Sequence, residues 1–303
     1  MEHISVLLNE AVDGLNVREG LTYVDATLGY GGHTSAIKKR LKRGFLFAFD
    51  QDDEAIDHAR KKFKDSENVT IIKSNFVNMK DELEMRGIDK VDGIIFDLGL
   101  SSPQIDDAKR GFSFMKDARL DMRMDRTKDK SAHTVVNEYK LEQLVDIFFK
   151  YGEERFSKQI AKSIIASRPI DTTLELVSII KSSVPAKYFL THHPERQIFQ
   201  AIRIEVNDEL RVLESVLPDA IELLNPGGRI SVITFHSLED RITKHIFNKY
   251  SKIDDLVKGL PEIPDGYKPK IKLVNKKPIV PSEEEINNNS RSKSAKLRIV
   301  ERV

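Results

Sequence analysis

Cysteine is absent from the 303-residue sequence. Its absence excludes a disulfide scaffold, a zinc–thiolate site and a cysteine nucleophile, and it is typical of proteins from a reducing compartment. No apolar run approaches the length that spans a membrane, and residues 1–12 are too polar for a secretory signal. We therefore expect a soluble, cytoplasmic protein with no membrane partner.

An excess of charge of one sign is also lacking. Lys and Arg number 49 and Asp and Glu 48, which leaves a net charge of +1. The overall charge therefore does not identify a nucleic-acid-binding protein, and local patches must decide that question. Apolar residues make up 40% of the chain, enough to bury a core, and the length suits one large domain with an insert, or two domains.

The first hundred residues alternate between short apolar runs and helical patterns. The strand-like runs are 22–25, 45–50, 69–73 and 92–97, and the helical candidates between them are about 32–42, 53–63 and 77–86. This alternation predicts a parallel sheet with helices on both faces. Right-handed crossovers then bring the carboxyl ends of the strands to one edge, where ligands bind in such sheets.

The pattern changes after Pro103, and no convincing strand occurs from 104 to 198. Loop-like, charged residues 106–130 are followed by helical patterns. The α/β pattern then resumes with one long helix predicted through residues 198–213, a turn, a strand and two final strands. The turn is 225–228, and the three strands are 229–235, 270–274 and 296–302. We predict a discontinuous α/β domain, 1–104 and 199–303, with a helical insertion at 105–198.

A glycine-rich turn follows the first strand. Gly29, Gly31 and Gly32 come after Asp25 and just before a helical pattern, so backbone N–H groups can approach a ligand at a helix amino terminus. No Gly-Lys-Ser/Thr occurs, which excludes a phosphate-clamping NTPase loop. Thr34 stands where a dinucleotide fingerprint requires a third small residue. Taken alone, the turn is equally consistent with a tight bend that binds nothing.

Suitable groups follow the next strands at the same predicted edge. Asp50 ends the second strand, where an acid can accept hydrogen bonds from both ribose hydroxyls of an adenosine ligand. Phe76 follows the third strand and can lie against adenine, although an ordinary core phenylalanine is the alternative. Asp97 ends the fourth strand. A ligand with adenine and ribose but no phosphate is S-adenosylmethionine, whose electrophilic methyl requires only a positioned nucleophile and no metal.

Eight segments, in order, resemble the signature segments of a known family. The segments are DATLGYGGH, FDLGLSSPQ, RGFSF, LDMRMD, YGEERF, FQAIRIEVNDEL, FHSLEDR and NNNSRSKSAKLR. They resemble the bacterial RsmH (formerly MraW) family, which methylates the N4 amine of a cytosine in the decoding region of 16S ribosomal RNA. The resemblance implies a Rossmann-like class I S-adenosylmethionine-dependent methyltransferase fold, an inserted helical domain for substrate recognition, and the small ribosomal subunit as the partner.

The resemblance also implies cofactor contacts. The family's cofactor positions fall on Gly31, Gly32, His33, Asp50, Phe76, Asp97 and Gln104. This chain departs from the family at Tyr30, where the family often has Arg, and at 288–291, where Asn-Asn-Ser-Arg replaces Asn-Pro-Arg. Neither departure touches a proposed cofactor contact.

The acceptor amine is a weak nucleophile, because its lone pair is conjugated into the cytosine ring, and a group that accepts one of its hydrogens would activate it. Ser101 or Ser102 can accept an N4 hydrogen, but each is equally suited to cap a helix or a turn. Asp97 could play this part instead, although the family resemblance favours its cofactor role. His236 can remove the proton after transfer, and a hydrogen-bonded structural histidine is the slightly favoured alternative.

Positive charge gathers near the carboxyl terminus. Residues 266–303 contain ten Lys or Arg against four Asp or Glu. Arg291, Lys293 and Lys296 lie in a flexible polar stretch that suits phosphate contacts, with a merely solvated segment as the alternative. Glu239 and Asp240 are expected to pair with Arg241 or cap a helix, so we predict no metal site.

Two other functions compete with an RNA methyltransferase. One is a nicotinamide-dependent dehydrogenase, which Thr34 and the Ser-Ser-Pro-Gln segment disfavour. The other is a non-enzymatic RNA-binding ribosome assembly factor on a methyltransferase fold, which the intact Gly31, Gly32 and Asp50 disfavour. The sequence does not distinguish a monomer from a homodimer.

Overall fold

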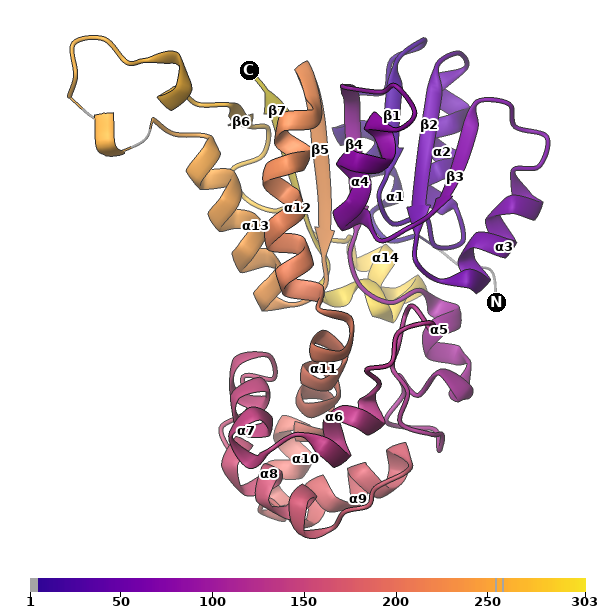
Figure 1. Ribbon diagram of the computed structural model, residues 1–303, viewed down its shortest axis with the longest axis vertical. Helices are drawn as coiled ribbons and strands as arrows, with labels where there is room; N and C mark the ends of the chain where they lie inside the picture. Colours follow the sequence, from indigo (N-terminus) through magenta and orange to yellow (C-terminus); the bar gives the residue numbers. More distant parts are fainter. Residues whose placement is uncertain (1–4, 254, 258) are drawn as a thin grey trace. The chain divides into compact units, whose positions relative to one another are not determined.

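The structure is a computed structural model that describes residues 5–253, 255–257 and 259–303, without the side chains of Ser102 and Asp255. The chain forms two compact units, drawn in Figure 1. The first unit contains Met1–Gly99 and Leu210–Val303, and the second contains Leu100–Glu209. The second unit includes the whole of the predicted insertion, 105–198, and continues through the next helix.

A seven-stranded sheet with the order β3-β2-β1-β4-β5-β7-β6 forms the centre of the first unit. Its strands are β1 Thr22–Asp25, β2 Phe45–Asp50, β3 Val69–Lys73, β4 Val91–Asp97, β5 Leu224–Thr234, β6 Ile271–Leu273 and β7 Lys296–Arg302. Strands β1 to β5 pair in parallel, and β7 pairs antiparallel with β5 and β6. The order reverses between β1 and β4, and such a switch point is where doubly wound sheets bind ligands. The predicted Rossmann-like fold is confirmed.

Helices cover both faces of this sheet because alternate strand residues point to opposite sides (Figure 1). Phe47 and Phe49 of β2 pack into one hydrophobic core, whereas Leu46 and Ala48 pack into others. The helices of the first unit are α1 Leu8–Gly14, α2 Gly32–Leu41, α3 Asp53–Lys62, α4 Met79–Glu84, α12 Glu209–Leu223, α13 Ser237–Tyr250 and α14 Glu283–Asn288. Residues of α4, α12 and α13 pack with Phe47, and residues of α1 and α2 pack with Leu46.

The second unit is helical and has its own core. Its helices are α5 Ser102–Asp106, α6 Ala132–Glu138, α7 Leu141–Lys150, α8 Ser157–Ala166, α9 Thr173–Ser182, α10 Ala186–His192 and α11 Pro194–Asn207. The buried Asn207 side chain ties the loop before α6 to α11, since it donates to the Met122 carbonyl at 2.8 Å and accepts from the Met124 amide at 2.8 Å. Across both units, none of the helices built from described residues has the length and apolar character needed to cross a membrane.

Two local predictions were wrong. The single helix predicted through 198–213 is two helices, α11 and α12, because Asp208 adopts a left-handed conformation with φ of 59°. The turn predicted at 225–228 lies inside β5. There, Val91 pairs with Leu224 and Gly93 pairs with Arg229, so the extra residues form an irregularity within a continuing strand.

Candidate functional site

The glycine turn connects β1 to α2 at the carboxyl edge of the sheet. Gly29 and Gly31 have φ values of 49° and 73°, in the left-handed region, and Gly31 precedes the first residue of α2. A Cβ at Gly31 would lie 2.7 Å from the Phe63 ring, so glycine is needed for both conformation and space. Among the residues that the structure describes, no side chain caps α2. Its first backbone N–H groups are therefore placed to receive an anionic or polar ligand group.

A lysine holds this turn from outside. Lys62 at the end of α3 donates from Nζ to the carbonyls of Tyr30 at 2.9 Å and Gly31 at 3.2 Å. Its charge is directed to carbonyl oxygens, whereas the lysine of a phosphate loop reaches the phosphate. The amides of Gly29 and Gly31 are used inside the fold, by Asp50 and by the Leu28 carbonyl, so the amides at the start of α2 are the ones left to a ligand. No signal in the sequence identified Lys62.

Asp50 couples the second strand to the glycine turn. Its Oδ2 accepts from the Gly29 amide at 2.8 Å, and its Oδ1 accepts from the Asp52 amide at 2.9 Å. Burial raises the pKa of Asp50 to about 6, while these two amides and the charges of Asp52 and Asp25 act more weakly. Each carboxylate oxygen has two lone pairs, so both can still accept a hydrogen bond from a ligand.

Asp25 is a third carboxyl group at this edge, and the sequence reasoning did not assign it to the site. It is fully buried, and its oxygens accept from the Thr34 hydroxyl at 2.6 Å and the Thr27 amide at 3.1 Å. Burial raises the pKa of Asp25 to about 6. The rule that selected Asp50 and Asp97, an acid ending a predicted strand, applies equally to Asp25.

Asp97 and His33 form a pair between β4 and α2. The His33 Nδ1 lies 3.4 Å from Oδ2 of Asp97, and the imidazole is buried. Among the described residues, Oδ1 of Asp97 has no hydrogen-bond partner. Burial, followed by the negative charges of Asp25 and Glu239, raises the pKa of Asp97 well above its ordinary value.

The glycine turn, His33, Asp50 and Asp97 therefore lie around a group of carboxyl groups. Asp50 and Asp97 each experience the negative charge of Asp25. Bringing like charges together out of water disfavours their ionised forms. A ligand with positive charge would relieve both the repulsion and the unsatisfied oxygen of Asp97.

Phe76 begins a short 3-10 turn, Phe76–Asn78, directly after β3. Its ring is half-buried and meets the Phe96 ring edge to face, with centroids 5.6 Å apart. The ring also packs against the core of the sheet. Phe76 is therefore a core residue that can also contact adenine, because a ring with one side in the core can present another side to a ligand.

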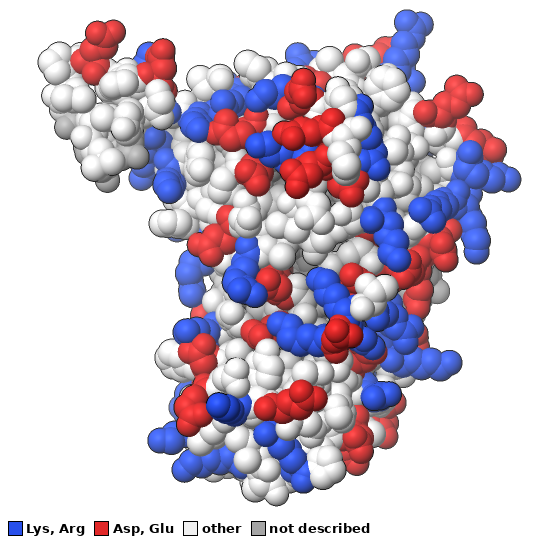
Figure 2. Space-filling view, viewed as in Figure 1, with Lys and Arg blue, Asp and Glu red and all other residues white. Residues whose placement is uncertain are grey.

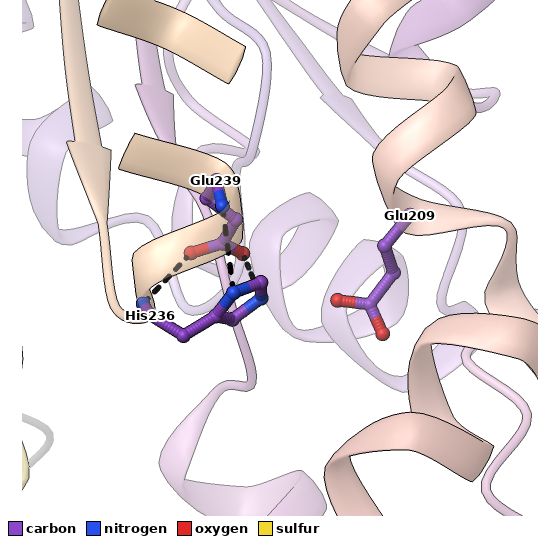
Figure 3. A group of neighbouring side chains, drawn as sticks. All are labelled: Glu209, His236 and Glu239. Carbon is purple, nitrogen blue, oxygen red and sulfur yellow. Dashed lines mark hydrogen bonds and ion pairs between the residues drawn. The ribbon is translucent and has the colours of Figure 1, made fainter. Parts of the chain in front are cut away.

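His236 and Glu239 cap α13 just beyond the carboxyl end of β5 (Figure 3). Glu239 accepts from the backbone amides of Phe235 and His236 at 2.7 and 3.2 Å. The His236 Nδ1 accepts from the Glu239 amide at 3.4 Å, and its Nε2 lies 3.1 Å from Oε1 of Glu239. In the neutral ring this arrangement places the proton on Nε2. These contacts match the structural role considered for His236.

Ser101 and Gln104 belong to the second unit, where they form a capping box for α5. The Ser101 hydroxyl accepts from the Gln104 amide at 3.4 Å, and Oε1 of Gln104 accepts from the Ser101 amide at 3.0 Å. The Ser102 side chain lies outside the described part of the structure. Glu209, also drawn in Figure 3, pairs with Arg203 through two hydrogen bonds of 2.9 and 2.8 Å in the second unit.

The three predicted RNA-binding residues have different environments. Arg291 and Lys293 are exposed on a 3-10 turn, Ser290–Ser294, just before β7. Lys296 is half-buried and pairs with Asp240 at 3.2 Å, alongside Arg298 at 2.7 Å. Asp240 thus pairs with two residues of β7, and Glu239 supplies the expected helix cap. On the face drawn in Figure 2, basic and acidic side chains are interspersed, in keeping with the net charge of +1.

Comparison with known proteins identifies a family along the entire chain. A family model described as the MraW methylase family matches residues 1–303. Similar solved structures include a provisionally assigned rRNA methylase from Clostridium thermocellum, with 16% identity, full coverage of both chains and a TM-score of 0.47. An rRNA methylase from Streptococcus thermophilus has 12% identity, coverage of 100% of this chain and 99% of its own, and a TM-score of 0.44. With TM-scores below 0.5, these likenesses carry no conclusion about function.

Proposed function

The chain belongs to the MraW methylase family, and from this premise we propose that it methylates the N4 amine of a cytosine in the decoding region of 16S ribosomal RNA. The proposed methyl donor is S-adenosylmethionine, and the proposed natural substrate is the small ribosomal subunit. The observation that supports the donor most directly is the glycine turn held by Asp50 beside the Asp97 carboxyl group, at the switch point of the sheet.

The residues at this edge fit the donor group by group. Asp50 can accept the ribose hydroxyls, and Phe76 can lie against adenine. The amides of Gly32 and His33 can receive the methionine carboxylate at the start of α2, while the Gly31 amide donates to the Leu28 carbonyl at 2.8 Å and Gly31 gives the turn its shape. The unpartnered Oδ1 of Asp97 suits the methionine ammonium group. When bound, S-adenosylmethionine supplies an electrophilic methyl on a cationic sulfonium, and the surrounding carboxyl groups favour that charge.

The acceptor amine requires a group that takes up its hydrogen. Ser101 and His236 remain the proposed candidates, and both also cap helices. A hydroxyl oxygen has two lone pairs, so Ser101 can accept a second hydrogen bond while it keeps its cap. The neutral His236 ring already accepts at Nδ1 from the Glu239 amide. We therefore assign the hydrogen-accepting role to Ser101 ahead of His236, and Gln104 would act on the donor side.

Isotope transfer into ribosomal RNA tests this function. Small subunits from cells that lack the protein are incubated with the purified chain and methyl-labelled S-adenosylmethionine, and the RNA is digested for nucleoside mass spectrometry. The expected product is N4-methylcytidine from 16S ribosomal RNA. Label in another nucleoside would overturn the cytosine N4 assignment. RNA binding without transfer of label would instead support the assembly-factor alternative.

A further inference from the structure

A small basic pocket lies in the first unit, between α13 and the last two strands. It is an open depression of about 290 Å³, a volume that includes solvent at its mouth, and it is lined in part by Lys244, Asn248, Asn275, Lys276 and Arg298. The described residues that line the pocket include no Asp or Glu. The pocket is separate from the glycine turn and from every site residue assigned above.

The two lysines of this pocket differ in their contacts from Arg298, which also lines it, and from Lys296 on the same strand. Lys296 and Arg298 share the carboxylate of Asp240, at 3.2 and 2.7 Å. Lys244 and Lys276 are exposed, and within the described part of the chain neither has a hydrogen-bond or ion-pair partner. Asp240 therefore pairs with two of these four cations, and the unpaired Lys244 and Lys276 leave a local excess of positive charge at the pocket.

The backbone directs these groups toward the same place. Asp240 and Lys244 are four residues apart on α13 and so lie on one face of the helix. Lys296 and Arg298 are two residues apart on β7 and lie on one face of the strand. Because Lys296 pairs in register with Thr234, the last residue of β5, this basic strip begins at the carboxyl edge of the sheet and leads to the pocket.

We propose that the pocket binds a phosphodiester group of the RNA substrate, with Lys244 and Lys276 as its principal ligands. The proposal rests on the RNA methyltransferase function proposed above. A phosphate oxygen can accept from both ammonium groups, and the Asn248 side chain can donate a further hydrogen bond. The Asn275 amide is already engaged, since its Nδ2 donates to the carbonyls of Lys277 and Leu297. Its fixed side chain therefore shapes the wall of the pocket.

The test compares two double variants of the full chain that lose the same charge. Lys244→Gln with Lys276→Gln removes the proposed ligands. Lys39→Gln with Lys42→Gln removes two exposed lysines at the carboxyl-terminal end of α2, away from the glycine turn. Affinity for a 16S ribosomal RNA transcript is measured from about 50 to 200 mM salt. Each lost phosphate contact should reduce the slope of log affinity against log salt by about 0.7–0.9.

We expect the pocket variant to bind RNA roughly 5- to 10-fold more weakly at the lowest salt, since one lost charge-assisted contact is about a tenfold effect. S-adenosylmethionine affinity should stay unchanged, and so should the methyl-transfer rate at saturating RNA. Equal RNA affinity and slope in both variants would overturn the pocket assignment. A larger loss of affinity for polyglutamate than for RNA would also overturn it, in favour of an acidic protein partner. Absence of methyl transfer by the unmodified chain would refute the proposed function instead.

Discussion

At the scale of single residues, the site is a group of acids that end strands. Asp25, Asp50 and Asp97 follow β1, β2 and β4, and burial raises the pKa of each. They serve different purposes: Asp25 bonds to Thr27 and Thr34 inside the fold, Asp50 bonds to the glycine turn, and Asp97 keeps an unsatisfied oxygen. Substitutions at these positions should therefore separate folding from ligand binding.

Replacing Asp50 tests the ribose contact. Asp50→Ala should weaken S-adenosylmethionine binding by about 10- to 100-fold, because a hydrogen bond to a charged group contributes about 1.5–3 kcal/mol. RNA affinity should change little. Isothermal titration and RNA binding assays measure the two effects. Asp52→Asn is the matched control, because it removes a charge two residues away while Asn still caps α3. Equal losses of donor and RNA affinity would contradict the role given to Asp50.

Asp25 should make the stability of the ligand-free protein depend on pH. Its pKa rises from an ordinary value near 4 to about 6 on folding, so between these values the folded state binds more protons than the unfolded state. The contribution of Asp25 is thus fully present below about pH 4 and is lost as pH rises to about 6. Two pKa units correspond to at most about 3 kcal/mol.

Asp25→Asn should abolish this loss, so the difference in unfolding free energy between variant and parent should shift in favour of the variant from about pH 4 to 6. Urea unfolding at a series of pH values measures it. Thr34→Val removes the 2.6 Å hydrogen bond and should move the window to higher pH, because that bond lowers the pKa of Asp25. A difference that stays constant with pH would show that Asp25 keeps its ordinary pKa in the folded protein.

At the scale of elements, the sequence predicted what depends on local pattern. The predicted strands 22–25, 45–50 and 69–73 agree with β1, β2 and β3, because each is a short run rich in β-branched or aromatic residues. The break at Asp208 and the irregularity in β5 depend on tertiary pairing, which no local pattern reveals. The contacts of Lys62 with the glycine turn and of Thr34 with Asp25 were missed for the same reason.

Gly31 of the glycine turn can be compared with Gly87, which lies elsewhere in the chain and has the same φ angle. Gly31 and Gly87 both have φ of 73°, but a Cβ at Gly87 would meet nothing within 4 Å, whereas at Gly31 it would meet the Phe63 ring. Gly87→Ala should therefore cost only the left-handed conformation, about 1–2 kcal/mol. Gly31→Ala should cost more and should also weaken S-adenosylmethionine binding, as measured by urea unfolding and calorimetry. If Gly31→Ala and Gly87→Ala changed stability equally and changed donor binding equally, the role given to the turn would be contradicted.

The segment before β7 should contact RNA through its exposed residues. Arg291→Gln with Lys293→Gln should lower RNA affinity and its dependence on salt. Lys296→Gln should affect RNA binding less, because Asp240 already neutralises Lys296. Fluorescence anisotropy with a 16S ribosomal RNA transcript at several salt concentrations measures both. If the slope of log affinity against log salt were unchanged in the double variant, this segment would be a solvated surface that does not contact RNA.

At the scale of the whole molecule, the α/β sheet and the helical segment were both foreseen, since one depends on alternating strands and helices and the other on uninterrupted helical patterns. What was not foreseen is that α11 belongs to the helical unit. The sequence shows helical periodicity through Asp208, and only the contacts of α11 with α6, α7 and α9 reveal the unit to which it belongs. The role of the helical unit in substrate recognition remains a prediction.

Ligand binding should stabilise the molecule selectively. S-adenosylmethionine at 100 times its dissociation constant should raise the unfolding free energy by about 2.7 kcal/mol, and the transition temperature by several degrees. NAD at the same concentration should have no effect, because the third small residue of a dinucleotide fingerprint is replaced by Thr34. Differential scanning calorimetry measures both. Stabilisation by NAD alone would revive the dehydrogenase alternative.

The most direct measurement is a crystal structure of the chain grown with S-adenosylhomocysteine or S-adenosylmethionine. Electron density for the ribose should lie on Asp50, with the methionine portion between the first amides of α2 and Oδ1 of Asp97. Density at another place, with Asp50 and the Gly29–Gly32 turn making no contact with the ligand, would contradict the account.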